Sequence, residues 1–201
     1  MSEIDYPLME DFYTIQGEGY NTGKAAYFIR LAGCDVGCVW CDVKDSWAVE
    51  NHPQVAIDEM ISRITDSGAD KVVVTGGEPA MYDLQPLTDA LKKNNLLRYI
   101  ETSGSYKLTG DWDWICVSPK KFKSPLPEVL KKANELKVIV YNKSDFDWGE
   151  KNAKLVNDNC LLYLQPEYSE IEKILPQIID YVKKNTRWRI SLQTHKVLGV
   201  R

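Results

Sequence analysis

The sequence Cys34-Asp-Val-Gly-Cys38-Val-Trp-Cys41 carries three cysteines at CxxxCxxC spacing, with an aromatic residue just before the last. Three thiolates on so short a loop can each bind one iron of a cubane, and a [4Fe–4S] cluster normally takes four cysteines. Because no fourth cysteine lies close by in the sequence, we expect a substrate or a cofactor to complete the cluster at its fourth iron. The loop therefore predicts an iron–sulfur centre that takes part in chemistry.

A structural zinc site is the main alternative for these cysteines. Zinc takes four tetrahedral ligands, usually Cys or His, and the chain has two histidines, His52 and His195. His52 lies eleven residues after Cys41, beyond the usual short ligand spacings, although a loop could bring it back. Cys116 and Cys160 lie in apolar, strand-like runs, where cysteine usually behaves as a small buried hydrophobic residue. A disulfide framework is disfavoured, because five cysteines leave one unpaired and no signal peptide is evident.

The composition is that of one ordinary globular domain. The chain has 201 residues, of which 44% are hydrophobic and 27% charged, and this length suits a single domain with a substantial core. The net charge of −4 gives no electrostatic basis for binding nucleic acid. No apolar run approaches the ~20 residues that cross a membrane. Because the first residues are acidic rather than basic, we expect a cytoplasmic protein whose thiols stay reduced.

Strand and helix patterns alternate along the chain. Short apolar or β-branched runs predict strands, and apolar residues at i, i+3, i+4 and i+7 predict amphipathic helices. The expected strands cover 26–31, 71–75, 97–101, 114–117, 136–140, 161–165 and 189–192. The expected helices cover 57–64 (ending near Gly68), 84–91, a short segment near Leu130, a polar segment at 151–157, and 171–182, where Pro176 is expected to kink or divide the helix.

Strands that alternate with helices form βα units around a parallel sheet. A complete (β/α)₈ barrel usually needs ~250 residues, so we predict an α/β fold with a partial, open TIM-like barrel of about six parallel strands and reduced helices. Residues 1–201 form one domain in this prediction. Function in such sheets gathers at the C-terminal ends of the strands, and the cysteine loop directly follows the strand 26–31.

A second motif, Thr75-Gly-Gly-Glu-Pro79, follows the valine-rich strand 71–75. Two glycines let a ligand approach the backbone closely. Gly-Gly alone is more simply a turn, but its position one βα unit after CxxxCxxC gives it weight. The segments Glu101-Thr-Ser-Gly104, Ser118-Pro-Lys120 and Leu164-Gln-Pro166 follow three later strands and offer hydroxyl, amide and backbone groups to a ligand.

Together the two motifs resemble the radical S-adenosylmethionine (SAM) superfamily. The resemblance implies that a [4Fe–4S] cluster is held by Cys34, Cys38 and Cys41. It also implies that SAM chelates the open iron through its amino and carboxylate groups, and that an electron from the cluster releases methionine and a 5′-deoxyadenosyl radical. The residues expected to contact SAM are Trp40, Asp42, Gly77, Ser118, Pro119, Lys120 and Gln165.

Three further segments are more specific than the cysteines. Ile15-Gln-Gly-Glu-Gly19, Phe28-Ile-Arg-Leu-Ala-Gly-Cys34 and Leu192-Gln-Thr-His-Lys196 resemble the 7-carboxy-7-deazaguanine synthase family of queuosine and 7-deazapurine biosynthesis. The resemblance implies a homodimeric carbon–nitrogen lyase that converts 6-carboxy-5,6,7,8-tetrahydropterin to 7-carboxy-7-deazaguanine with loss of ammonia, after the radical takes hydrogen from C6. It also implies a reductant such as a flavodoxin or ferredoxin.

The residues themselves suit a pterin that carries a carboxylate. Gln16 and the backbone of residues 15–17 offer paired donors and acceptors to a flat heterocycle, and Arg30 can bind a carboxylate through two parallel hydrogen bonds. Arg30 could equally form a surface ion pair, and Glu18 either polarises the ring or caps its loop. With the resemblance, the expected substrate-binding residues are Ile15, Gln16, Gly17, Arg30, Thr75, His195 and Arg201.

One position departs from the family pattern. Two residues after the last cysteine the family commonly has Thr or Ser, whose hydroxyl helps to bind Mg²⁺, whereas this chain has Val43 beside Asp42. An expected Mg²⁺ would therefore depend on other protein groups, water and substrate oxygens. Two other functions remain open at this point: an activating enzyme for a glycyl-radical protein, which shares CxxxCxxC, and a non-enzymatic zinc-binding interaction module.

Overall fold

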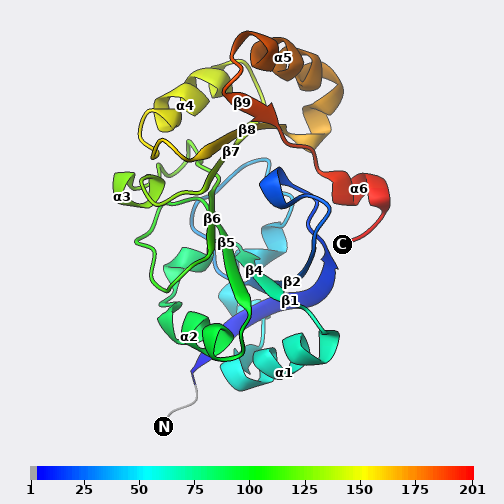
Figure 1. The fold of residues 1–201 in the computed structure, drawn as a ribbon, viewed down its shortest axis with the longest axis vertical. Coiled ribbons are helices and arrows are strands. Elements are labelled where there is room, and N and C mark those ends of the chain that lie inside the picture. Colours follow the sequence, from blue (N-terminus) through cyan, green and yellow to red (C-terminus); the bar gives the residue numbers. More distant parts are fainter. Residues whose placement is uncertain (1–3) are drawn as a thin grey trace.

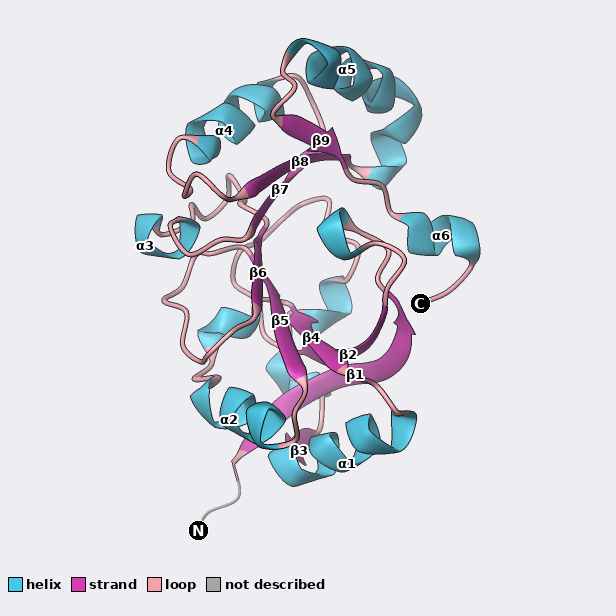
Figure 2. Cartoon of the chain, in the orientation of Figure 1, coloured by secondary structure: helices cyan, strands magenta, loops and turns pink. Residues whose placement is uncertain are grey.

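The computed structural model describes residues 4–201 and contains a nine-stranded sheet. The strands pair in the order β3-β1-β2-β4-β5-β6-β7-β8-β9 (Figure 1; β3 is labelled in Figure 2). From β2 to β9 each strand is parallel to its neighbour, whereas β1 is antiparallel to both β2 and β3. The strands are β1 (Asp5–Ile15), β2 (Ala25–Leu31), β3 (Gln54–Ala56), β4 (Lys71–Gly76), β5 (Leu97–Thr102), β6 (Trp114–Val117), β7 (Glu135–Val140), β8 (Leu161–Pro166) and β9 (Trp188–Ile190).

Helices α1, α2, α4 and α5 lie around the outside of this curved sheet, and α6 lies at its open side, as Figure 2 shows. The α-helices are α1 (Ile57–Ser67), α2 (Gln85–Lys93), α3 (Pro127–Leu130), α4 (Ser144–Ala153), α5 (Ile171–Lys184) and α6 (Thr194–Leu198). Short 3-10 turns are η1 (Gly19–Asn21), η2 (Lys44–Ser46), η3 (Val49–Asn51), η4 (Pro79–Met81) and η5 (Tyr168–Glu170). Within residues 4–201, no helix has the length and apolar character needed to cross a bilayer.

The sheet is open, because β3 and β9 stand at the two ends of the strand order. This arrangement confirms the predicted α/β fold with a partial, open barrel. The hydrophobic periodicity of α1 is also confirmed: Met60 and Ile64 are completely buried, and the helix ends at Gly68, which has φ 73°. The apolar face of each such helix packs on the sheet or on its neighbouring helix, because this burial removes hydrocarbon from water.

The antiparallel strand β1 was not part of the prediction. Its sequence is interrupted by acidic residues, which hide the alternation typical of a strand. The fold pairs these acids across elements: Glu10 contacts Arg30 on β2 (2.9 Å), and Asp11 contacts Arg63 on α1 (3.1 Å). Such long-range ion pairs cannot be read from local sequence, so the strand emerges only in the folded chain.

The polar helix predicted at 151–157 is wrong in position, since α4 covers Ser144–Ala153. The side-chain oxygen of Asn142 accepts hydrogen bonds from the backbone N–H and the hydroxyl of Ser144 (3.0 and 2.7 Å), which starts the helix earlier. Asn157 instead donates its amide to the Ala133 carbonyl before β7 (2.7 Å). Side-chain bonds of this kind compete with helix formation; the first lies at the start of α4 and the second lies beyond its end.

Two expectations near the C-terminus are also corrected. Pro176 does not divide α5, which continues from Ile171 to Lys184. The proline removes one backbone donor, but Ile174 and Ile178 are buried as the helix packs on β8 and β9. The last strand is β9 at Trp188–Ile190 rather than 189–192. Just after it, Ser191 donates its backbone N–H to the Leu164 carbonyl (2.9 Å) and its hydroxyl to Gln165 (2.6 Å) of β8.

The loop after β1 bridges the open side of the sheet. The carbonyl of Gly17 accepts hydrogen bonds from the backbone N–H and hydroxyl of Thr194 (both 2.9 Å). The N–H of Gly19 donates to the Ser191 hydroxyl (2.9 Å), and that of Tyr20 donates to Glu135 on β7 (3.2 Å). The loop therefore joins the β1 side of the sheet to residues 191–201, here called the C-terminal segment, and encloses a space at the strand ends.

Candidate active site

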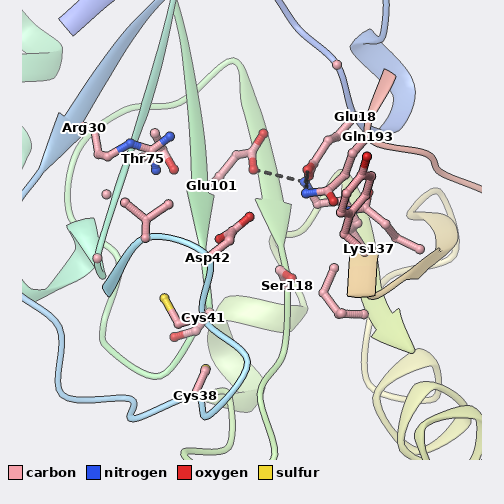
Figure 3. A pocket seen from close by; sticks show the side chains of 18 of the residues that line it. Glu18, Arg30, Cys38, Cys41, Asp42, Thr75, Glu101, Ser118, Lys137 and Gln193 are labelled. Carbon is pink, nitrogen blue, oxygen red and sulfur yellow. Dashed lines mark hydrogen bonds and ion pairs between the residues drawn. The ribbon is translucent and has the colours of Figure 1, made fainter. Parts of the chain in front are cut away.

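A cavity of about 280 Å³ opens at the C-terminal ends of the parallel strands. Its walls come from the cysteine loop, the turn after β4, the loop after β1 and the C-terminal segment, and Figure 3 shows several of these side chains around a shared space. Every residue predicted to bind the cluster, SAM or substrate lines this cavity except Pro119. The Pro119 carbonyl accepts a hydrogen bond from the Trp148 indole (3.2 Å), so it contacts α4 instead.

The cysteine loop begins just after β2. Gly33 adopts φ 103°, a conformation open to glycine and rarely to other residues, and its N–H donates to the Ser46 carbonyl (2.6 Å). Further on, the N–H of Cys41 donates to the Cys38 carbonyl (3.1 Å). These turns bring Cys34, Cys38 and Cys41 to the cavity wall as free thiols.

The chemistry of these thiols fits an iron–sulfur cluster. Burial raises the pKa of both Cys34 and Cys38, so binding of a metal must release protons. Within residues 4–201, no three His, Cys, Asp or Glu side chains are placed to hold a single metal ion. In a cubane each thiolate binds a different iron, so the sulfurs need not converge on one point. Cys116 and Cys160 are buried outside this cavity.

The turn after β4 is built against the cysteine loop. A Cβ atom at Gly77 would collide with the carbonyl oxygen of Gly33, so glycine is required for this close approach. The next residue, Glu78, is 1% exposed, and its N–H donates to the same carbonyl (2.8 Å). Its carboxylate accepts hydrogen bonds from the Thr102 hydroxyl (2.5 Å) and the Ser103 N–H (2.7 Å). Glu78 thus fixes the turn between the cysteine loop and the end of β5.

A partly buried lysine lies beside the cysteine loop. Lys120 donates a hydrogen bond to the Ser118 hydroxyl (2.6 Å), and its ammonium lies 5.1 Å from the centre of the Trp40 ring. Among the described residues no carboxylate pairs with it, and burial lowers its pKa. Gln165, which is 1% exposed, accepts a hydrogen bond from Ser191 (2.6 Å). This wall therefore offers a cation and an amide to a ligand.

A different pair of cations meets on Glu10 of β1. Arg30 Nε lies 2.9 Å and Arg201 Nη1 lies 3.4 Å from the two oxygens of this carboxylate. The Thr14 hydroxyl donates to the carbonyl of Arg201 (2.9 Å), which holds the C-terminal residue against β1. Arg30 thus lines the cavity, but its guanidinium, expected to bind the substrate carboxylate, already pairs with Glu10 through Nε. Its Nη groups are the atoms that can turn to an anion.

The strands also gather charged groups that the sequence analysis did not predict as a unit. Lys137 on β7 forms ion pairs with Glu18, in the loop after β1, and with Glu101 on β5 (Nζ–Oε2 3.0 Å), all of which Figure 3 labels. Gln16 donates to Glu101 (2.8 Å), and Gln193 donates to Glu18 (2.9 Å). The available signal was a lysine inside the apolar run at 136–140, since lysine is almost never fully buried unless it is paired.

The ion pairs shift the titration of this group. Burial, the largest single influence, raises the pKa of Glu18, but the charge of Lys137 and the hydrogen bonds from Lys137 and Gln193 together outweigh it and lower that pKa to about 2. Burial alone would lower the pKa of Lys137, but Glu101 and Glu18 raise it well above its usual value. Glu18 and Lys137 are therefore both charged at neutral pH.

Three further positions singled out in the sequence, His195, Val43 and His52, differ in their place relative to the cavity. A Cβ atom at Gly17 would collide with the ring of His195, so this imidazole packs directly on the loop backbone. Val43 lines the cavity close to Asp42, and an isopropyl group faces the site where the family pattern has a hydroxyl. His52 lies outside the cavity, with a ring nitrogen 2.8 Å from the Asp45 carbonyl oxygen. It therefore does not join the cysteines.

This arrangement has counterparts among known proteins. The family model of the radical SAM superfamily matches residues 28–142, which include both the cysteine loop and the turn after β4. The site and the fold thus define the class of protein as a radical SAM enzyme.

Relatives over nearly the full length narrow this class. A 7-carboxy-7-deazaguanine synthase from Flavobacterium psychrophilum is 56% identical, over 96% of this chain and 92% of its own. One from Synechocystis sp. is 47% identical, over 98% of this chain and 95% of its own. The crystal structure of QueE from Escherichia coli aligns with a TM-score of 0.83 and 36% identity, and the alignment covers 95% of each chain. The chain belongs to the 7-carboxy-7-deazaguanine synthase family.

Membership confirms the enzyme class predicted from the sequence. A radical SAM enzyme uses a [4Fe–4S] cluster and SAM, so both cofactors follow from the family. The two alternative functions, a glycyl-radical activating enzyme and a zinc-binding interaction module, are not supported, because the full-length relatives carry a different name and activity.

Proposed function

We propose that this chain converts 6-carboxy-5,6,7,8-tetrahydropterin to 7-carboxy-7-deazaguanine and ammonia, on the route to queuosine and related 7-deazapurines. The similarity to synthases of that name over nearly the full chain supports the reaction. The structural observation that carries the proposal is the single cavity that the cysteine loop shares with the loop after β1 and the C-terminal segment. The cysteine loop, which would hold the cofactors, and the walls that would bind a heterocycle therefore face the same space.

The cofactor end of the cavity would be the cysteine loop with its adjoining turns. Its free thiols would hold the cluster, and the backbone around Gly77 would receive the amino group of SAM. When bound, the cluster and SAM supply the 5′-deoxyadenosyl radical that starts the reaction. Lys120 has no carboxylate partner within residues 4–201, which suits contact with an anionic group of the cofactor. Trp40, Asp42, Ser118 and Gln165 would complete the SAM site.

The substrate end would be formed by the loop after β1, by β2 and by the C-terminal segment. Arg30 and Arg201 place two guanidinium groups beside Glu10 at this end of the cavity, and a guanidinium suits the carboxylate of the pterin. The backbone of residues 15–17, together with Thr75 and His195, would bind the ring. Their role is to orient the C6 hydrogen of the substrate and to exclude water.

Magnesium would sit close to Asp42 if the enzyme uses it. Mg²⁺ prefers six oxygen ligands and commonly keeps several waters beside one or two carboxylates. The side chain of Val43 provides no oxygen, so the ion would depend on Asp42, water and the oxygens of the substrate. We propose weaker Mg²⁺ binding than in relatives that have a hydroxyl at this position.

The wider setting of the enzyme is proposed from its family resemblance. A homodimer, a cytoplasmic location and a one-electron donor such as a flavodoxin or ferredoxin are the expected features. Gel filtration with light scattering tests the dimer, and cluster reduction by each donor protein tests the electron source.

Product analysis tests the proposed reaction directly. Anaerobically reconstituted enzyme would be incubated with SAM, reductant and 6-carboxy-5,6,7,8-tetrahydropterin, and the products identified by mass spectrometry. We expect 7-carboxy-7-deazaguanine and ammonia in equal amounts. Cleavage of SAM with the pterin recovered unchanged would contradict the proposal.

A further inference from the structure

Two acids on the cavity wall share one buried cation. The side chain of Lys137 is 3% exposed, and those of Glu18 and Glu101 are 16% and 23% exposed. Both acids line the cavity together with the lysine. The three groups come from the loop after β1, from β5 and from β7, so only the assembled barrel brings them together.

Physical chemistry makes the lysine necessary for this pair of acids. Two carboxylates that share a poorly hydrated site disfavour each other's ionisation, and one of them takes up a proton unless a cation compensates. A cation bonded to both acids removes this repulsion and also fixes where their oxygens lie. Gln193 and Gln16 each donate to one of the acids, which further restricts their rotation.

We propose that Lys137 is a positioning residue that compensates the negative charges of Glu18 and Glu101 and holds both carboxylates toward the cavity, where they accept hydrogen bonds from the N–H-rich edge of the heterocyclic substrate. This inference rests on the proposed function, since a pterin presents adjacent ring N–H and amino groups. An ionised carboxylate only accepts hydrogen bonds and matches such an edge, whereas a protonated one offers a competing donor. Lys137 acts through the two acids rather than on the reacting atoms.

Other titratable groups surround the pair without replacing the lysine. Burial raises the pKa of both Glu135 on β7 and Cys116 on β6, and neither supplies positive charge. His195 on α6 favours the ionised form of Glu18 through its charge, but it is not bonded to that acid. Lys120 pairs with neither acid. Among residues 4–201, Lys137 is the cation in ion-pair contact with Glu18 and with Glu101.

The pH dependence of substrate binding tests this role. The pterin would be titrated by fluorescence into reconstituted, SAM-loaded enzyme without reductant, between pH 6 and pH 9, so that no turnover occurs. The variants are Lys137→Met, Lys137→Arg, which keeps the charge, and Lys71→Met. Lys71 is a matched control, because its side chain is 15% exposed and ion-paired with Asp70 outside the cavity.

We expect wild type, Lys137→Arg and Lys71→Met to bind with an affinity that changes little over this range. Lys137→Met should bind at least tenfold more weakly at pH 6 and recover most of this loss towards pH 9, as the shared proton leaves. A loss in Lys137→Met that is the same at every pH would overturn the proposal, because a purely structural role gives no new titration. Unchanged affinity in Lys137→Met would also overturn it.

A comparison of melting temperatures provides a second test. It needs no substrate, and it remains informative if Lys137→Met folds poorly. Lys137→Met should lower the melting temperature of the holoenzyme, whereas Lys137→Met combined with Glu101→Gln should recover part of this loss, because the second change removes one of the two like charges. A double variant no more stable than the single one contradicts the charge argument. If wild type binds no pterin, the proposed function fails, and the melting temperatures still decide whether Lys137 compensates the acids.

Discussion

Arg30→Ala should weaken binding of the carboxylated pterin while leaving SAM binding nearly unchanged. The side chain lines the cavity and is 19% exposed, and its Nε is held by Glu10. A hydrogen bond to a charged group contributes ~1.5–3 kcal/mol, which corresponds to a loss of about 10- to 150-fold in affinity. Because Glu10 already compensates part of the charge, we expect a loss towards the lower end of this range.

Calorimetric titration of the reconstituted enzyme separates the two ligands. Arg30→Lys should recover only part of the affinity, since an ammonium cannot bind Glu10 and the substrate in the same fork geometry. Arg63→Ala is the control, because this arginine joins α1 to Asp11 of β1 outside the cavity. The ion pair Arg30–Glu10 is partly exposed, so its removal should change the free energy of unfolding by no more than about 1 kcal/mol. Loss of SAM affinity with pterin affinity intact would refute this placement of Arg30.

Three further outcomes follow from the same structure. Cys38→Ala should lose the cluster and SAM cleavage, whereas Cys160→Ala, which lies outside the cavity, should keep both; iron and labile-sulfide analysis decides. Val43→Thr should lower the Mg²⁺ concentration for half-maximal activity, because it adds a hydroxyl ligand; a flat response of chelator-treated wild type to Mg²⁺ would argue against a bound ion. The pKa of Glu18 is lowered from its ordinary value of 4.5 to about 2, so the ionised carboxylate stabilises the fold above pH 4.5 and loses this effect as the pH falls towards 2. Across that window the free energy of unfolding of the wild-type apoprotein, measured by chemical denaturation, should therefore fall by on the order of 3 kcal/mol more than that of Glu18→Gln. A difference in unfolding free energy between the two proteins that does not depend on pH would contradict the assignment.

Much of the barrel could be predicted from local sequence. Consecutive valines in β4 and the apolar periodicity of α1 depend only on which residues must be buried, so their positions were clear. The positions of β1 and α4 could not be predicted in this way, because each element depends on contacts between segments that are distant in the sequence. The acids of β1 find their partners on β2 and α1, and the side-chain bonds of Asn142 and Asn157 lie at the start of α4 and beyond its end.

The candidate site divides in the same way. The cysteine loop and the turn containing Gly77 have short sequence signatures, and the structure brings both to one cavity. The group formed by Lys137, Glu18 and Glu101 has no such signature, since its members are far apart in the chain and meet only through the strand order. The pairing of Arg30 with Glu10 likewise follows from the register of β1 against β2.

The central claim is that the radical source and the pterin share one cavity. The transfer of deuterium from substrate to cofactor is the sharpest test. The enzyme would be supplied with 6-carboxy-5,6,7,8-tetrahydropterin deuterated at C6, and the deuterium content of the 5′-deoxyadenosine formed would be measured by mass spectrometry. We expect one deuterium in 5′-deoxyadenosine, formed together with 7-carboxy-7-deazaguanine. Unlabelled 5′-deoxyadenosine alongside the same product would contradict direct contact between the radical and C6 of the substrate.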